Sequence, residues 1–145
     1  MSRPLKALLI EDCEEDTLLL LRELRRGGFA VESERVDDEP GLRAALTRGP
    51  WDVVFSDFHM PGFGAQAAFA IVKAHSPDVP FIIVSGTLGE EAAVAAMRQG
   101  VDDYLSKGRL SRLAPAVERE LAEAANRRAK RALEARLGET QRQLE

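Results

Sequence analysis

The stretch VVFSDFHMPGFG, residues 53–64, contains the pattern that decides the fold. Its first residues are typical of a buried strand, and the carboxylate of Asp57 stands where the apolar run ends. A turn around Pro61 and Gly62 follows. A charge at the end of a buried strand costs free energy unless it has a partner or a use, so the stretch predicts a functional site at a sheet edge.

Apolar runs of this kind recur along the chain, with helical patterns between them. The runs that predict strands are residues 6–11, 30–36, 52–57, 80–85 and 103–107. The segments that predict helices are residues 17–28, 39–50, 65–75 and 90–100. Strands that are almost wholly apolar are covered on both faces, so the alternation predicts an α/β fold with a parallel sheet. Residues 30–36 alternate between apolar and polar, which suits an edge strand.

Five such units favour a flavodoxin-like (βα)5 doubly wound sheet with strand order 2-1-3-4-5. An eight-unit barrel needs about 250 residues, and this chain has 145. The net charge of −4 and the absence of a large basic patch argue against nucleic-acid binding. The basic run at residues 126–131 is interpreted as a solvated helix face.

The single cysteine, Cys13, excludes an internal disulfide and indicates an intracellular protein. The apolar runs are far shorter than the ~20 residues of a membrane span, and the start of the chain lacks the pattern of a signal peptide. We therefore expect a soluble cytoplasmic protein with no membrane partner.

Polar residues end four of the predicted strands, and their ends meet at one edge of a parallel sheet. The residues are Glu11, Asp12, Asp57, Ser85 and Lys107. Three carboxylates close together repel one another unless a cation neutralises them. Oxygen ligands of this kind suit Mg²⁺, and a carboxylate can also attack phosphorus. The residues alone predict an acidic Mg²⁺ site.

Four motifs make the pattern specific. They are LLIEDCEED at residues 8–16, SDFHMPG at 56–62, IIVSGT at 82–87 and DDYLSK at 102–107. In this order and on these strand ends, they resemble the receiver domain (CheY-like) of bacterial two-component response regulators. The resemblance covers roughly residues 4 to 122, and the joint occurrence of four motifs is far more specific than any one of them.

The resemblance implies a phosphoryl site. Asp57 matches the phosphoacceptor, Lys107 the lysine that pairs with the phosphoryl group, Ser85 the switch hydroxyl and Tyr104 the switch aromatic residue. It also implies how Mg²⁺ is held. Asp12, Asp57 and the backbone carbonyl of His59 would bind the ion directly, whereas Glu11 would act through water.

The expected function is a phosphorylation-dependent signalling switch of a two-component phosphorelay. A histidine kinase or phosphotransfer protein would donate the phosphoryl group, and the face built by the fourth helix, fifth strand and fifth helix would change. The chain is not expected to be an enzyme in the usual sense, although slow autodephosphorylation is compatible with this chemistry. The alternative is a phosphorylation-independent, receiver-like adaptor or dimerisation module. A phosphohydrolase of the haloacid-dehalogenase type is disfavoured because His59 stands where those enzymes have a second aspartate.

Each site residue also has a structural interpretation. Asp12 has the spacing of a helix cap with Glu15, and Glu11 is compatible with an ordinary surface acid. Ser85 could cap a loop, Tyr104 could be part of the core, and Lys107 could be an ordinary loop lysine.

Two positions depart from the family pattern. The family usually has proline after the lysine, where this chain has Gly108, so Lys107 would be less rigidly placed. Gly64 and Ala65 stand where the family commonly has a polar residue and then glycine, which alters the start of the third helix and not the chemistry.

The C-terminal segment changes in character. We expect a receiver domain over residues 1–125 and a helical extension over 126–145, rich in residues with high helix propensity. Its residues at four-, three- and four-residue spacing are Leu133, Leu137, Thr140 and Leu144, with Gly138 interrupting them. This pattern allows two interpretations, a homodimer formed through a coiled coil or a bare solvated helix. By the resemblance, such an extension often leads into a covalently linked output domain.

Overall fold

The computed structural model describes residues 2–58, 60, 62–86 and 90–144. Five parallel strands form one sheet, and their order is β2-β1-β3-β4-β5. The strands are β1 (Arg3–Ile10), β2 (Phe29–Val36), β3 (Val53–Ser56), β4 (Phe81–Ser85) and β5 (Asp103–Ser106). The helices are α1 (Glu14–Arg26), α2 (Glu39–Thr47), α3 (Ala65–His75), α4 (Glu90–Arg98), the short 3₁₀ helix η1 (Lys107–Arg112) and α5 (Leu113–Leu144). The predicted flavodoxin-like fold and strand order are confirmed.

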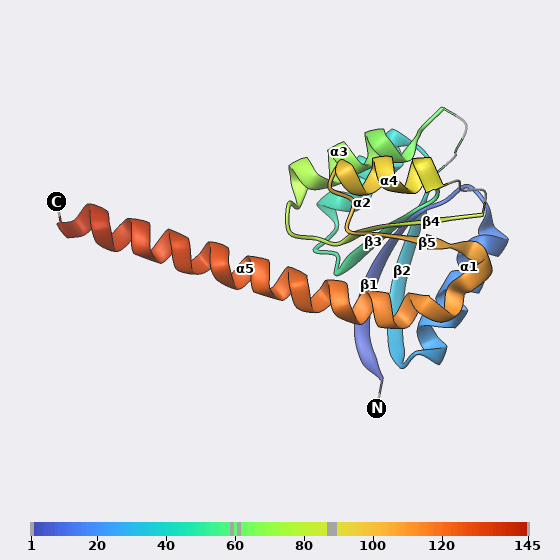
Figure 1. Cartoon of the computed structure of the whole chain (residues 1–145), viewed down its shortest axis with the longest axis horizontal. Coiled ribbons are helices and arrows are strands. Elements are labelled where there is room, and N and C mark those ends of the chain that lie inside the picture. Colours follow the sequence, from blue (N-terminus) through green and yellow to red (C-terminus); the bar gives the residue numbers. More distant parts are fainter. Residues whose placement is uncertain (1, 59, 61, 87–89, 145) are drawn as a thin grey trace.

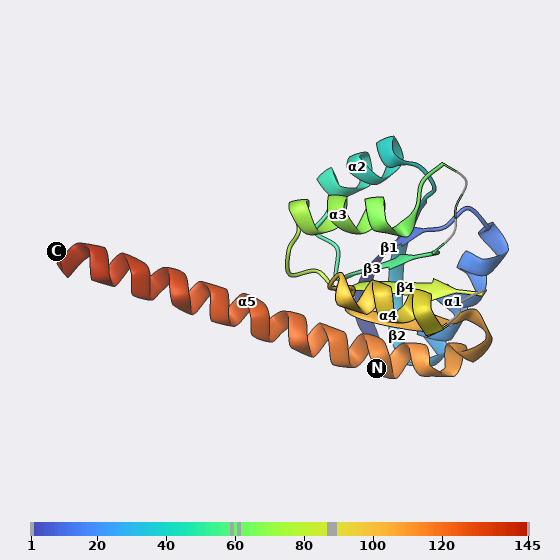
Figure 2. The same ribbon diagram turned by 45° about the horizontal axis from the view of Figure 1, so that its top comes forward.

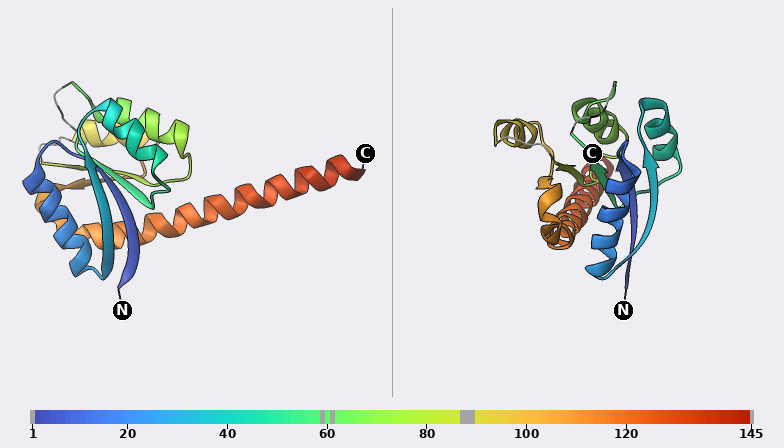
Figure 3. Two further views of the ribbon diagram at one scale, coloured as in Figure 1. Left: turned by 180° about the vertical axis from the view of Figure 1, so that it is seen from behind. Right: turned by 90° about the vertical axis from the view of Figure 1, so that its right-hand side faces the viewer.

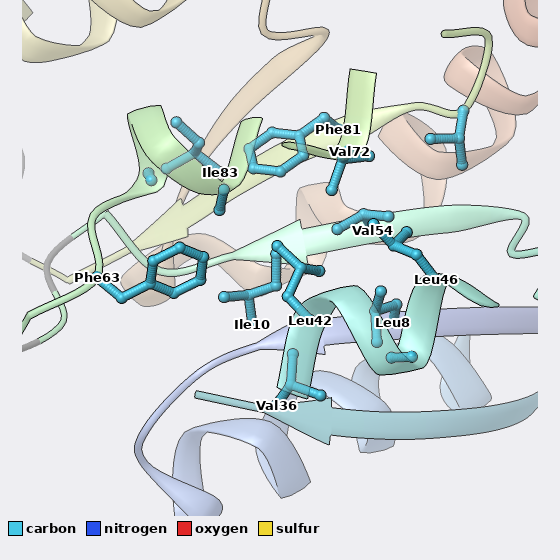
Figure 4. Packing of buried hydrophobic residues seen from close by; sticks show 14 of the residues in the cluster. Leu8, Ile10, Val36, Leu42, Leu46, Val54, Phe63, Val72, Phe81 and Ile83 are labelled. Carbon is cyan, nitrogen blue, oxygen red and sulfur yellow. The ribbon is translucent and has the colours of Figure 1, made fainter. Parts of the chain in front are cut away.

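The core consists of two apolar layers, one on each face of the sheet. On one face, side chains from α2, α3 and α4 pack against the sheet, and Figure 4 shows Leu42, Phe63 and Val72 directed at Ile10 and Val54. On the other face, α1 and α5 supply the packing residues. Figure 3 shows these two groups of helices on opposite sides of the strands, and in Figure 2 α2 and α3 lie above the strands and α5 below them. Both layers exist because β1, β3 and β4 are apolar on both faces.

Strand β2 lies at the edge of the sheet, as its alternating sequence predicted. Helix α1 buries Leu20, Leu21 and Leu24 against the sheet, and its acidic first turn and basic last turn match the helix dipole. Its close approach to α5 requires a glycine at its end. A Cβ atom at Gly27 would come within 2.3 Å of the Cβ of Ala114.

Helix α5 is continuous from Leu113 to Leu144 and projects well beyond the body of the protein (Figure 1). Gly138 does not interrupt the helix. The basic run at residues 126–131 is mostly exposed, as the interpretation of a solvated helix face predicted, but Arg127 is half-buried and donates a hydrogen bond of 3.0 Å to the carbonyl of Asp78 in the body. In the part of the chain that the structure describes, no helix is both long and apolar enough to cross a membrane.

Candidate functional site

Three carboxylates meet at the carboxyl ends of β1 and β3, where the strand order reverses. The parallel register aligns Ile10 with Ser56, so the residues that follow these strands lie side by side. The backbone N–H of Asp57 donates to the carbonyl of Ile10 at 2.9 Å, which fixes this alignment. Glu11, Asp12 and Asp57 each present an oxygen within 4.8 Å of the other two. The structure thus brings together the acidic residues predicted from sequence.

The carboxylates differ in their surroundings. Glu11 is buried, and its Oε1 accepts a hydrogen bond of 3.1 Å from the backbone N–H of Cys13. Burial raises the pKa of Glu11 to about 7, assisted by the negative charge of Asp57 and opposed by the bonds from Lys107 and Cys13. Asp57 is 13% exposed at its side chain, and its Oδ1 accepts from the N–H of Phe58 at 2.8 Å. Asp12 is exposed to solvent.

Lys107 points its ammonium group into this cluster. Its Nζ lies 3.0 Å from Oε2 of Glu11 and 3.5 Å from Oδ2 of Asp57. Burial alone would lower the pKa of Lys107, but its hydrogen bonds to Asp16 and Glu11 and the charge of Asp57 raise it above the usual value. The lysine is therefore charged and lies within ion-pair distance of Asp57. The loop-lysine interpretation does not explain these contacts.

Two hydroxyl groups near the site have no hydrogen-bond partner among the described residues. Ser85 ends β4 and is 2% exposed, yet its Oγ has no partner. The hydroxyl of Tyr104 on β5 is also buried without one. Burial raises the pKa of Tyr104 to about 12, and the charge of Asp57 adds to this effect. A buried hydroxyl without a hydrogen-bond partner costs free energy. Each of the two hydroxyls can therefore lower this cost by hydrogen bonding to a ligand or to a group brought close by a conformational change.

Asp16 belongs to the same cluster, and the sequence analysis missed it. Its Oδ2 lies 2.6 Å from Nζ of Lys107, the shortest of the lysine's three ion pairs. The helix predicted from residue 17 in fact begins at Glu14, and this start places Asp16 in the first turn. The acidic run at residues 14–16, typical of the first turn of a helix, was a signal that could have found it.

The capping interpretation of Asp12 is wrong. Cys13 is the N-cap residue of α1, and its own side chain makes no capping hydrogen bond. The family's proline position holds Gly108, whose N–H binds Oγ of Ser106 at 3.1 Å at the start of η1. His59, whose carbonyl was expected to bind metal, lies outside the described residues.

The donor set fits a hard divalent cation. Glu11, Asp12 and Asp57 offer carboxylate oxygens, which are the ligands that Mg²⁺ prefers. A cavity of about 30 Å³, room for about one water, borders Glu11, Asp16, Asp57 and Lys107. The site therefore combines crowded negative charge with one ammonium group, and the adjoining cavity is otherwise lined mostly by apolar residues.

Comparison with known proteins gives the family. The sequence model of the response regulator receiver domain matches residues 7–118. This chain therefore belongs to the response regulator receiver family and to two-component signalling.

Individual relatives agree. The response regulator protein FleR of Pseudomonas aeruginosa is 33% identical over 108 residues, which are 70% of this chain and 21% of FleR. The transcriptional regulatory protein PrrA of Mycobacterium tuberculosis is 31% identical over 102 residues, 70% of this chain and 43% of PrrA. The solved structure of NtrX from Brucella abortus is 26% identical with a TM-score of 0.78, and the match covers 95% of this chain and 30% of NtrX. The chain spans less than half the length of these relatives.

Proposed function

We propose that this chain is a phosphorylation-dependent switch in which Asp57 accepts a phosphoryl group from a phosphohistidine of a histidine kinase or phosphotransfer protein. The observation that carries the proposal is the group of Glu11, Asp12 and Asp57 oxygens within 4.8 Å of one another, beside the ammonium of Lys107. A carboxylate oxygen of Asp57 attacks phosphorus, the P–N bond breaks, and the imidazole nitrogen leaves with the electron pair. The acceptor is consumed, so the chain is not an enzyme in the usual sense. Slow hydrolysis of the acyl phosphate would reset it.

Mg²⁺ is the proposed cofactor. Asp12, Asp57 and the backbone carbonyl of His59 would hold it, with Glu11 acting through water. When bound, the ion neutralises the acidic cluster and the charge of the incoming phosphoryl group. Lys107 balances the remaining phosphoryl charge from the other side.

The proposed output is a change at the α4-β5-α5 face. Phosphorylation replaces one carboxylate charge by a group of about −2 with three acceptor oxygens. The free hydroxyl of Ser85 donates to one of these oxygens, and Tyr104 adjusts to the displaced Ser85. Hydrogen exchange of α4 and β5 with and without phosphorylation would measure this change.

The acceptor is tested by incubation with acetyl phosphate and Mg²⁺, followed by intact-mass measurement. We expect one phosphoryl adduct, lost in Asp57→Asn and in samples treated with a chelator. Asp52→Asn is the matched control, because Asp52 precedes the same strand at the opposite sheet edge, where its Oδ2 accepts from the N–H of Lys6. An adduct that survives in Asp57→Asn contradicts the proposal. No adduct on the wild-type chain would favour the phosphorylation-independent adaptor.

We also propose that the projecting part of α5 pairs with a second copy of the chain and leads to a linked output domain. The side chains of Leu133 and Leu137 are 54% and 61% exposed on neighbouring turns of α5, and burial against a partner would remove this apolar surface from water. Sedimentation of the wild type and of the Leu133→Glu, Leu137→Glu double variant tests the pairing. A wild type that sediments as a monomer rejects it. The cytoplasmic location stays a prediction.

A further inference from the structure

The strongest contact of Lys107 is with Asp16, a residue outside the predicted site. Oδ2 of Asp16 lies 2.6 Å from the ammonium nitrogen, compared with 3.0 Å for Glu11 and 3.5 Å for Asp57. The contact joins the first turn of α1 to the end of β5 across 91 positions of sequence. Lys107 is thus held closest to a carboxylate on the α1 side of the site.

Asp16 has a different relation to the site from the other carboxylates. The three oxygens that could share a metal ion come from Glu11, Asp12 and Asp57, and among the described residues Asp16 is not in that group. Its ion pair with the lysine ties it to the site. Lys107 opens η1, where the N–H of Gly108 donates to Oγ of Ser106, and the ammonium group of Lys107 is held by its side-chain partners.

We infer that Asp16 is a positioning residue that competes with the phosphoryl group on Asp57 for Lys107. In the unphosphorylated chain Asp16 draws the ammonium toward α1. The phosphoryl group then has to draw it back. Asp16 thereby weakens the binding of the phosphoryl group. This inference rests on the function proposed above.

The competition is moderate on physical grounds. The side chain of Asp16 is 34% exposed, so water can solvate its carboxylate once the ammonium has left. The incoming group carries about −2 charge and three acceptor oxygens, which makes it a stronger partner for the lysine. A cavity of about 30 Å³ borders Asp16, Asp57 and Lys107. Asp16 therefore tunes the strength of phosphoryl binding without blocking it.

Beryllium fluoride with Mg²⁺, a non-covalent stand-in for the phosphoryl group, gives a direct test by titration calorimetry of the full chain. We expect Asp16→Asn to bind it about fivefold more tightly than the wild type, the scale of one partly exposed ion pair. Asp16→Glu, which keeps the competing charge, should stay close to the wild type. Glu15→Gln is the matched control, since it removes one exposed charge from the same helical turn.

A second measurement separates competition from a structural role. In a Lys107→Ala background, Asp16→Asn should bring no further gain, because the competitor acts only through the lysine. Unchanged or weaker binding by Asp16→Asn overturns the inference, as does a gain that persists without Lys107. If the wild type itself binds no beryllium fluoride in Mg²⁺, the proposed function fails. If the wild type binds beryllium fluoride and Asp16→Asn binds it equally tightly, only the proposed role of Asp16 is rejected.

Discussion

Two charged clusters lie at opposite edges of the sheet, and they differ in charge balance. The rim cluster, at the carboxyl ends of the strands, consists of Glu11, Asp12, Asp16, Asp57 and Lys107. The base cluster, near their amino ends, consists of Lys73, Asp78, Asp102, Arg127 and Arg131. Among the described residues, the rim cluster has four carboxylates and one lysine, which pairs with three of them, whereas the base cluster has two carboxylates and three cations.

The base cluster has the properties of a structural element. Oδ2 of Asp102 accepts from Lys73 at 2.9 Å and from the N–H of Phe81 at 2.7 Å. Arg127 and Arg131 tie α5 to Asp78, with Arg131 at 3.1 Å from its Oδ1. These contacts fix the direction in which α5 leaves the body.

The rim cluster has the opposite character. Its excess of carboxylates raises the free energy of the folded chain until a cation or another ligand balances the charge. The comparison teaches that the candidate site is marked by carboxylates in excess of cations, whereas a cluster in which each carboxylate has a cationic partner supports the structure. Four predictions test this contrast, from the largest expected effect to the smallest.

Removing a base carboxylate should destabilise the protein. Asp102→Ala removes the carboxylate that binds the largely buried ammonium of Lys73 and the N–H of Phe81, and Lys73 keeps its bond to the carbonyl of Val79. We expect a cost of about 3 kcal/mol in the free energy of unfolding. Urea denaturation measures this loss. The exposed Asp37→Ala should change stability by less than about 0.5 kcal/mol. Equal stability of the two variants would contradict a structural role for the base cluster.

Mg²⁺ should stabilise the folded chain through the rim. At a Mg²⁺ concentration of about 100 times its dissociation constant, binding adds about 2.7 kcal/mol to the free energy of unfolding. Asp12→Asn and Asp57→Asn should lose most of this increment, whereas Asp102→Ala should keep it. Denaturation with Mg²⁺ and with a chelator provides the comparison, and an increment that survives in both rim variants would place the ion elsewhere.

Glu120 is the exception near the base and should make stability depend on pH. It is 3% exposed, its Oε2 has no hydrogen-bond partner among the described residues, and Glu123, Asp102 and Asp103 surround it. Burial, followed by these like charges, raises its pKa to about 6, against the opposing bond from Arg119. The folded state therefore holds the proton more tightly than the unfolded chain, and this contribution to stability is lost as pH rises from about 4.5 through about 6.

Glu120→Gln should consequently be more stable than the wild type at pH 7.5, by about 2 kcal/mol. The difference should shrink toward pH 4.5, where the wild-type side chain is protonated. Thermal or urea unfolding across this range measures it. A constant difference at every pH would mean that titration of Glu120 is not the cause.

Removing a rim carboxylate should stabilise the protein in the absence of metal. Asp57→Asn relieves repulsion with Glu11 and Asp12, and Lys107 keeps its contacts with Glu11 and Asp16, so we expect a gain of about 1 kcal/mol in chelator. The gain should decrease as salt is added. Asp52→Asn at the other end of the strand should show no gain. A loss of stability in Asp57→Asn would contradict the view that the charges of the rim cluster repel one another while those of the base cluster stabilise the fold.

Much of the fold could be predicted because its signals are local. All five strands occur where apolar runs predicted them, with β3 one residue shorter at each end than expected. The start of α1 was missed by three residues, since the acidic turn before Thr17 carries no apolar periodicity. Because the helix was predicted to begin after Asp16, this residue was not recognised as part of the site.

The sequence by itself determined that polar residues end successive apolar strands. Because the carboxyl ends of parallel strands meet at one edge of the sheet, it also determined that carboxylates and a lysine lie at the same edge. Only the tertiary structure decided how Lys107 divides its contacts among Asp16, Glu11 and Asp57, and that Arg127 reaches Asp78. These choices depend on distances between side chains far apart in sequence. Packing of α1 and α5 on the sheet sets those distances, and no local pattern records them.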